Sequence, residues 1–299
     1  MATRNGACFL PDQLQSICNQ KLRDWKLFVS DDCSLDATYE IISEYSRRLP
    51  QGQVELLQGP GQGAAANFMS LIRRAPEAEY YAFSDQDDVW LPEKLSHATE
   101  ALARVPKDRP ALYCARVTVC DASLRELHLT PPPTSRPGFR NALIQNIAHG
   151  NTIVFNQAAH EILRPAAARL PQVVMHDWWA YLVISGAGGE VIFDDRSDVL
   201  YRQHSGNVVG EARGLERQLR KVQAMFSNRH SEWLTINLQA MSEILDMLDD
   251  ENRSLVELLV EARSSSQVLF SLVCLREHIH RQGRFGRLIP PVSAMLGVI

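Results

Sequence analysis

Short apolar runs alternate with longer amphipathic stretches over the first two-thirds of the chain. The apolar runs predict strands at 25–30, 54–58, 80–84, 111–120, 152–155, 190–193 and 199–202. Between them, apolar residues at helical spacing predict helices near 10–20, 35–48, 64–75, 92–105, 157–169 and 177–186, with Asp36 as an N-cap and Pro92 in a first turn. Alternating strands and helices indicate an α/β fold, a mostly parallel sheet flanked by helices.

The pattern changes after about residue 211. Apolar residues then recur at helical spacing, first at Leu215, Leu219, Val222 and Phe226, then at Trp233, Ile236, Met241, Ile244 and Leu248. A third helical stretch is predicted over about 253–280. We therefore expect a first domain over residues 1–210 and an all-helical C-terminal extension over 211–299.

Composition narrows the class of protein. A length of 299 residues, with 45% hydrophobic and 22% charged residues, is ordinary for a soluble globular chain. The formal net charge of −4 argues against nucleic acid as the main partner. Six cysteines without a CxxC pair favour reduced, cytosolic thiols, and no signal peptide or membrane-spanning stretch is expected.

The segment SDQDDVW, 84–90, places three carboxylates directly after an apolar run. A solvated turn is one interpretation, whereas a calcium loop of the EF-hand type does not fit the spacing. Ser30-Asp31-Asp32 ends another predicted strand, and the turn GPGQG follows a third. Because ligands bind at the carboxyl ends of strands in open α/β sheets, these groups are expected to face one crevice. A divalent cation and a diphosphate would stabilise such a cluster.

Several of these segments resemble family 2 glycosyltransferases with the GT-A fold, and most of all their bacterial rhamnosyltransferase branch. The motifs are TRNG (3–6), SDDCSLDAT (30–38), GPGQGAAANF (59–68), FSDQDDVWLPEKL (83–95), HGNTIVFN (149–156), MHDWW (175–179) and YRQHSGNVVG (201–210). The resemblance implies a nucleotide half over about 1–110 and an acceptor half over about 111–210. Only Met1 and Ala2 precede Thr3, fewer residues than the first strand of family members usually has.

The resemblance implies a nucleotide site in the first half. Asp31 matches the aspartate that accepts a hydrogen bond from the pyrimidine base, and Asp32 is expected near the ribose. The remaining nucleotide-binding candidates are Thr3, Arg4, Asn5, Gly61 and Asp85.

It also implies a bound Mg²⁺ or Mn²⁺. Asp85 and Asp87 match the DxD-like pair, in which Asp87 is the expected ligand and Asp85 faces the ribose, the metal or a metal-bound water. His204 matches a histidine that contacts the metal or the diphosphate, with Arg202 on the phosphate side of the same strand; a satisfied surface or core histidine is the alternative. Asp88 is either a substrate-side ligand or orienting group, or a carboxylate at a helix N-terminus.

In the acceptor half, Asp177 matches the catalytic base of inverting members, and a helix N-cap is the structural alternative. His176 is expected to orient Asp177 or merely to adjoin it. Trp178 and Trp179 either line the sugar site or belong to the core. Asn151 is expected to face the donor sugar or the acceptor.

The function expected from the resemblance is inverting transfer of L-rhamnose from dTDP-β-L-rhamnose to a lipopolysaccharide core or another saccharide or lipid-linked glycan acceptor. Another UDP- or dTDP-sugar donor, or a non-catalytic sugar-nucleotide or glycan-binding homologue, are the alternatives. A cytoplasmic location is expected. The basic stretch before the apolar end LIPPVSAMLGVI suggests peripheral contact with the inner membrane, and a packed terminal helix is the alternative; its members are Arg276, His278, His280, Arg281, Arg284 and Arg287.

Overall fold

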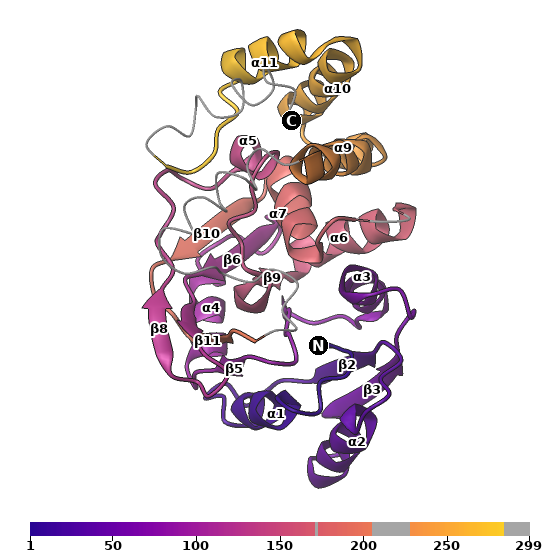
Figure 1. The fold of residues 1–299 in the computed structure, drawn as a ribbon, viewed down its shortest axis with the longest axis vertical. Helices are drawn as coiled ribbons and strands as arrows, with labels where there is room; N and C mark the ends of the chain where they lie inside the picture. The colour runs from indigo at the N-terminus through magenta and orange to yellow at the C-terminus, as the bar shows by residue number, and fades with distance from the viewer. Residues whose placement is uncertain (171–172, 205–227, 284–299) are drawn as a thin grey trace.

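The computed structural model describes residues 1–170, 173–204 and 228–283 (Figure 1). A small sheet at the N-terminal end is followed by a second sheet in the middle and by a helical part at the far end (Figure 1). The predicted boundary near residue 210, the first tail helix around 215–226 and the last residues of the basic stretch, 284–299, lie outside the described residues.

The N-terminal sheet consists of β1 (Ala2–Thr3), β2 (Leu27–Asp31) and β3 (Val54–Gln58), all paired in parallel. Helices α1 (Leu10–Cys18), α2 (Thr38–Arg48) and α3 (Ala64–Arg74) connect and cover these strands. Asp36 lies two residues before α2 and not at its cap position, which Ala37 occupies, but its carboxylate accepts a hydrogen bond from Thr38 N at 3.0 Å.

The second sheet has the order β10 (Glu190–Asp194), β6 (Ala111–Ala115), β9 (Val154–Asn156) and β4 (Tyr80–Ala82). β10 and β6 are parallel, whereas β9 is antiparallel to both of its neighbours, so the prediction of a mostly parallel sheet is replaced by a mixed one.

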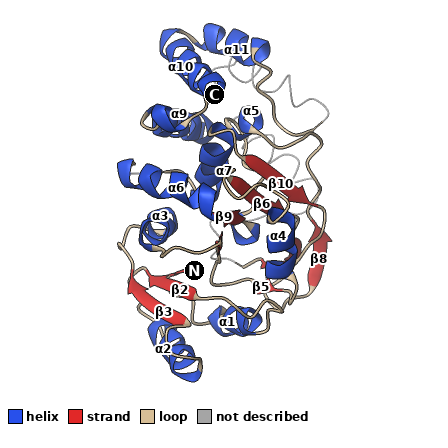
Figure 2. Cartoon of the chain, turned by 180° about the vertical axis from the view of Figure 1, so that it is seen from behind, coloured by secondary structure: helices blue, strands red, loops and turns tan. Residues whose placement is uncertain are grey.

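Helices cover both faces of this sheet. Ala111, Tyr113 and Ala115 pack in one apolar cluster beside α4 (Lys94–Leu102), while Leu112 and Cys114 belong to the cluster of α6 (Gln157–Arg169) and α7 (His176–Gly186). This alternation is the period of two expected for a strand. Figure 2 shows α6 and α7 on one side of these strands and α4 on the other. α4 begins two residues after Pro92, which therefore precedes the helix.

A third sheet joins β5 (Val89–Trp90), β11 (Val199–Arg202), β7 (Thr118–Cys120) and β8 (Glu126–Leu129). The single strand predicted at 111–120 is in fact two strands in different sheets. The chain changes sheet at Arg116 and Val117, where Thr130 Oγ1 accepts a hydrogen bond from Val117 N at 3.0 Å. The short helices α5 (Phe139–Ala142) and η1 (Gly150–Thr152) lie between β8 and β9.

The helical part contains α9 (Asn228–Ser242), η2 (Leu245–Met247), α10 (Asp250–Ser265) and α11 (Gln267–Arg276). The stretch predicted at 253–280 is thus two helices, separated at Ser266, whose side chain accepts a hydrogen bond from Leu269 N at 3.1 Å. Leu238 and Met241 of α9 share one apolar cluster with α7. Within the described residues, no helix combines the length and the apolar character needed to cross a membrane.

Candidate active site

Hydrogen bonds join the loop after β1 to the loop after β2. Asp31 Oδ1 accepts hydrogen bonds from Thr3 Oγ1 at 2.9 Å and Ser34 Oγ at 2.5 Å. Asn5 donates through its backbone to Ser34 Oγ at 2.8 Å, and its side chain accepts from Leu35 N. The structure therefore brings Thr3, Asn5 and Asp31 to one place at the carboxyl ends of β1 and β2.

The glycine-rich turn after β3 is organised by Asp32. Its carboxylate, in a residue only 1% exposed, accepts hydrogen bonds from Gly61 N at 2.6 Å and Gly63 N at 2.7 Å. Gly61 and Gly63 have φ angles of 71° and 92°, a region that glycine enters without strain. The expected ribose contact of Asp32 is therefore corrected to a positioning role. Arg4 lies nearby, with its Nη1 3.9 Å from Asp32 Oδ2.

Gln86 links the acidic loop to the first turn, a role that was not predicted from the sequence. Its side chain accepts a hydrogen bond from Arg4 N at 2.8 Å and donates one to Arg4 O at 3.0 Å. Gly6 accommodates the contact, because a Cβ there would lie 2.2 Å from Gln86 Oε1. Amide side chains that bond both backbone groups of another residue are recognisable only from structure.

Asp85, Asp87 and His204 form the acidic end of the site. His204 Nε2 lies 2.9 Å from Asp87 Oδ2, and both side chains are about one-fifth exposed, at 19% and 18%. Burial, together with the charges of Asp87 and Asp177, raises the pKa of Asp85 to about 7, although the charge of the N-terminal amino group opposes the shift. A Cβ at Gly150 of η1 would lie 3.3 Å from Asp177 Cβ, and Asn151 of η1 donates to Asp88 Oδ2 at 2.7 Å. The segment η1 therefore joins the start of α7 to the acidic loop, and the two border a common space. The structure thus assembles the four side chains from three separate motifs.

The pair of Asp87 and His204 fits a divalent cation. Two ligands at right angles on an octahedral ion with bonds of about 2.1 Å lie about 3.0 Å apart, close to the separation in this pair. In the described part of the chain, no group of three or more His, Cys, Asp or Glu side chains is arranged to hold a metal. Such a cation would therefore need oxygen atoms from a bound diphosphate or from water to complete its coordination.

Asp88 does not face a substrate. It is completely buried before β5, and its carboxylate accepts hydrogen bonds from Asn151 Nδ2 at 2.7 Å and from Arg202 N at 3.3 Å. Burial, together with the charges of Asp85 and Asp87, raises its pKa well above the usual range. The substrate contact and the helix N-terminal carboxylate are therefore wrong, whereas the remaining interpretation, that Asp88 orients its neighbours, agrees with these two hydrogen bonds. Asn151 is 3% exposed, and its Oδ1 has no hydrogen-bond partner among the described residues.

Arg202 is built into the protein and does not face a phosphate. The residue is 3% exposed, and its guanidinium donates to Asp87 O at 3.0 Å, Ala122 O at 2.7 Å and Asp12 Oδ2 at 2.8 Å. It also stacks over Phe9, 4.7 Å from the ring centroid, while the same ring lies 4.7 Å from the His204 ring. The predicted phosphate contact is corrected to a positioning role for Asp87. Asp12 and Phe9, which complete this arrangement, were missed by the sequence analysis.

Asp177 lies in the first turn of α7, where Met175 occupies the N-cap position, so the N-cap interpretation does not hold. Its Oδ1 accepts a hydrogen bond from Trp178 N at 2.7 Å. Burial raises the pKa of Asp177 to about 6, although hydrogen bonds from Trp178, Asn146 and Gly150 oppose the shift. A carboxylate with a pKa in this range is suited to accept a proton near neutral pH. Asn146 was not among the expected site residues.

The other residues of the MHDWW motif belong to the interior. Trp178 and Trp179 are each 1% exposed and lie in the main apolar cluster, so they do not line a sugar site. His176 stacks on Phe68 with 3.6 Å between ring centroids, and its Nε2 has no hydrogen-bond partner among the described residues. Burial lowers its pKa to about 3, so the ring is neutral. No hydrogen bond from its side chain to Asp177 is found in the described structure.

Comparison with known proteins identifies the family. A model of the family "Glycosyl transferase family 2" matches residues 1–163, more than half of the chain. The chain belongs to glycosyl transferase family 2. The dTDP-rhamnosyl transferase RfbG of Shigella flexneri is 29% identical over 218 residues, which cover 70% of this chain and 73% of RfbG. This relative agrees with the rhamnosyltransferase resemblance seen in the sequence.

Solved structures agree on the fold of this family 2 glycosyltransferase. S. aureus TarS 1–349 in complex with UDP-GlcNAc has a TM-score of 0.56 at 14% identity, covering 98% of this chain and 87% of the TarS 1–349 chain. The mannosyltransferase PcManGT from Pyrobaculum calidifontis, in complex with GDP-Man and Mn²⁺, has a TM-score of 0.52 at 16% identity, covering 99% and 84%. At these identities the likeness shows the fold alone, which is GT-A with a helical C-terminal part.

Proposed function

We propose that this glycosyltransferase transfers L-rhamnose from dTDP-β-L-rhamnose to a hydroxyl group of a bacterial surface polysaccharide or lipopolysaccharide core, with inversion and with Mg²⁺ or Mn²⁺ bound. The observation that carries the proposal is the common space between the pair Asp87–His204 and the base candidate Asp177. The choice of donor is supported by the RfbG relative.

Each side chain has one task in this proposal. Asp87 and His204 hold the cation, which offsets the negative charge of the leaving diphosphate. Asp31, with Thr3 and Asn5 beside it, contacts the nucleotide base, and Asp85 faces the ribose or the cation. Asp177 accepts the proton of the attacking hydroxyl group on the opposite side of the sugar from the leaving group. Asp32, Gln86 and Arg202 keep the loops that carry these groups in place.

A thermal-shift panel of sugar nucleotides, each with and without Mg²⁺ or Mn²⁺, tests the donor and the metal together. The true donor should give the largest stabilisation, because ligand stabilisation grows with ligand concentration over Kd. We expect dTDP-rhamnose with metal to raise the Tm more than UDP-GlcNAc does. Asp87→Ala should lose the part of this Tm increase that depends on the metal. Asp108→Ala, an exposed carboxylate in the turn before β6, is the matched control.

Other results of the thermal-shift panel would favour the alternative functions. A response to UDP-GlcNAc without one to dTDP-rhamnose would replace the donor while keeping the chemistry. Donor binding that is indifferent to both cations would refute the proposed metal. Tight donor binding without any transfer to oligosaccharide acceptors would favour a non-catalytic sugar-nucleotide-binding protein.

Membrane contact through the C-terminal tail stays a hypothesis, as does the cytoplasmic location. The described part of the basic stretch is engaged within the protein: Arg276 Nε donates to Glu277 Oε1 at 2.8 Å, and His280 Nε2 lies 3.1 Å from Ser135 Oγ. Burial also lowers the pKa of Arg281. These contacts favour a segment packed on the protein for residues 276–283, of which only Arg276, the last residue of α11, is helical. Co-sedimentation with anionic liposomes that is unchanged on deletion of 284–299 would count against the hypothesis.

A further inference from the structure

The half-buried ring of Phe9 lies between two residues of the candidate metal site. Its centroid is 4.7 Å from the guanidinium carbon of Arg202 and 4.7 Å from the centroid of the His204 ring, with 32° between the two ring planes. Arg202 is the last residue of β11, and His204 follows it by two residues. Both side chains therefore rest on one aromatic ring.

The His204 imidazole is contacted at one edge and on one face. At the edge, Nε2 lies 2.9 Å from Asp87 Oδ2, and on the face lies the Phe9 ring. The backbone just before His204 is held as well, because Gln203 N donates to Cys120 O at 2.9 Å. A contact at one edge atom restrains the position of that atom, whereas packing against the face restrains the plane of the ring. Phe9 therefore supplies the contact that sets the direction of Nε2.

Phe9 is itself held by the loop after β1. Phe9 N donates to Gly6 O at 3.1 Å, and Gly6 N donates to Thr38 Oγ1 at 2.8 Å. Ala7 N donates to Asp36 Oδ2 at 3.0 Å. The hydrogen bonds that join the loops after β1 and β2 on the nucleotide side therefore also fix the backbone that carries the Phe9 ring.

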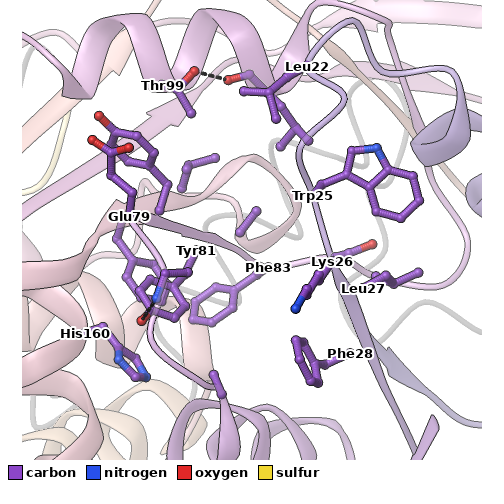
Figure 3. A pocket seen from close by; sticks show the side chains of 18 of the residues that line it. Leu22, Trp25, Lys26, Leu27, Phe28, Glu79, Tyr81, Phe83, Thr99 and His160 are labelled. Atoms are coloured by element: carbon purple, nitrogen blue, oxygen red, sulfur yellow. Dashed lines mark hydrogen bonds between the residues drawn. The ribbon is translucent and has the colours of Figure 1, made fainter. Parts of the chain in front are cut away.

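The helix that begins after Phe9 provides a second support. Leu10 and Leu14 of α1 are 0% and 2% exposed, so the first half of this helix is packed in the core. At the other end of the helix, Ile17 borders a cavity of about 800 Å³ between the N-terminal sheet and the second sheet, and Leu22 lines the same cavity (Figure 3). The position of Phe9 therefore depends on the packed half of α1 and not on the end beside the cavity.

The charge distribution of the ring suits both of its neighbours. The face of an aromatic ring attracts positive charge, and the guanidinium of Arg202 is always charged. An imidazole that donates its electron pair to a cation also becomes more positive, so its contact with Phe9 should strengthen when a metal is bound. Phenylalanine has no donor atom, so Phe9 cannot compete with His204 for the cation.

We propose that Phe9 is a positioning residue for the candidate metal site. Its ring holds the His204 imidazole in the plane in which Nε2 and the Asp87 carboxylate bind one divalent cation. The inference rests on the proposed function, since that function requires a cation bound together with a nucleoside diphosphate. Phe9 acts through His204 and is not a ligand.

Pulsed EPR of Mn²⁺ bound together with dTDP tests the inference, because a coordinating histidine nitrogen modulates the electron-spin echo of the metal. The wild-type protein should show this nitrogen coupling. Phe9→Leu keeps an apolar side chain but removes the ring, so the coupling should weaken and the Mn²⁺ affinity should fall at least about 10-fold. Phe9→Tyr keeps the ring and should retain both the coupling and the affinity of the wild type.

Phe193→Leu makes the same change at a half-buried phenylalanine of β10 and is the control for a loss of packing. It should leave the nitrogen coupling and the Mn²⁺ affinity unchanged. Binding of dTDP without metal should be similar in the wild type and in Phe9→Leu, because the ring acts on the metal side only.

Three results would overturn the inference while the proposed function stands. They are an unchanged coupling and Mn²⁺ affinity in Phe9→Leu, a Phe9→Tyr variant as weak as Phe9→Leu, and an equal loss of metal-free dTDP binding in Phe9→Leu. Absence of nitrogen coupling in the wild type would instead overturn His204 as a metal ligand in the proposed function, and this inference with it.

Discussion

At the scale of single residues, the site is defined by carboxylates that the protein keeps away from water. Burial raises the pKa values of Asp85, Asp88 and Asp177, yet only Asp85 and Asp177 face the common space. Asp88 instead bonds Asn151 and the backbone of Arg202. Within one acidic motif, Asp88 is therefore bonded inside the protein, whereas Asp85 has a proposed chemical role.

Replacement of the base candidate should separate binding from turnover. In Asp177→Asn, we expect kcat for transfer to fall by about 10² to 10⁴-fold, because the amide cannot accept the proton of the acceptor hydroxyl group. Donor affinity should stay within a few-fold, since the proposed mechanism places Asp177 on the acceptor side. Initial rates and donor titration calorimetry measure the two quantities. Transfer at the wild-type rate would eliminate Asp177 as the base.

The pKa of Asp177 also predicts opposite effects of pH on activity and stability. Its pKa of about 6 means that the ionised form, which is the base, is lost as pH falls below that value, and the rate of transfer should fall with it. A carboxyl pKa raised on folding favours the protonated form, so this contribution to stability is present at low pH and is lost as pH rises through about 6.

Asp177→Asn should therefore stabilise the ligand-free protein at pH 7.5, by about 1 to 3 kcal/mol in the free energy of unfolding. The difference from the wild type should vanish below about pH 3, where Asp177 is protonated in both the folded and the unfolded states. Urea unfolding at the two pH values measures it. A variant that is less stable than the wild type at pH 7.5 would contradict the assigned pKa.

The sequence could predict some of these residues and not others. Asp87, His204 and Asp177 were predicted because their chemistry matches motifs; the structure pairs Asp87 with His204 at 2.9 Å and places Asp177 in the first turn of α7, and their roles stay predictions. The roles of Asp32 and Arg202 could not be read from the motifs. Their polar atoms are already bonded to backbone groups far away in the sequence, at Gly61 and Ala122 for example. Residue type indicates which groups a side chain can bind, whereas the fold determines which of these groups it contacts.

At the scale of elements, the end of β11 sets the geometry of the candidate metal site. β11 pairs with both β5 and β7, which fixes the backbone of Arg202 beside the acidic loop. From there the guanidinium reaches Asp87 O and Asp12, and the chain continues for two residues to His204. One strand end therefore positions both members of the pair that would hold the cation.

Arg202→Lys should weaken binding of the cation more than it lowers kcat. Lysine keeps the charge but lacks the planar fork that contacts Asp87 O, Ala122 O and Asp12 together. We expect about a 10 to 100-fold loss in apparent metal affinity, as for other groups that orient metal ligands. Activity at saturating Mn²⁺ should recover most of the kcat.

Titration of activity against Mn²⁺ measures both effects. Arg125→Lys, in an exposed ion pair with Asp121 on the β7–β8 turn, is the matched control and should behave like the wild type. An Arg202→Lys enzyme with unchanged metal affinity and reduced kcat at saturation would show that Arg202 does not act through the cation.

Most long elements were predicted, and the misses have physical causes. The strands at 54–58 and 199–202 agree with β3 and β11, whose apolar residues leave no ambiguity. β5 and β8 were missed because a two-residue strand and a short, half-exposed strand have too little periodicity to detect. The break between β6 and β7 was missed because both pieces are apolar, and the change of sheet depends on Thr130, a distant partner.

At the scale of the whole molecule, the helical part and the catalytic half share a core. Trp233 of α9 meets Trp178 of α7 edge-on, with 6.3 Å between ring centroids, and Met241 and Ile244 are completely buried in the same cluster. The helix that carries Asp177 is therefore packed between the second sheet and α9. We propose that residues 228–283 unfold together with the rest of the chain.

Met241→Ala tests this connection. Removal of a completely buried methionine side chain should lower the free energy of unfolding by about 2 to 5 kcal/mol. Because the core is shared, far-UV circular dichroism and tryptophan fluorescence should shift to the same lower midpoint. Val260→Ala, on the more exposed side of α10, is the control with little expected change. Two separate transitions, with only one of them shifted, would show an independent helical domain.

The carboxylate of Asp32 has a consequence for the electrostatics of the entire donor site. Successive backbone N–H groups in a glycine-rich turn often form an anion-binding nest, yet here Gly61 N and Gly63 N are already bonded to an internal anion. The Asp32 carboxylate therefore already occupies two N–H donors of this turn, and these two donors are not free to bind a phosphate. Under the proposed function, the charge of the nucleoside diphosphate would then be balanced mainly from outside the polypeptide, and the counter-ion would be an integral part of the donor and not an accessory to it.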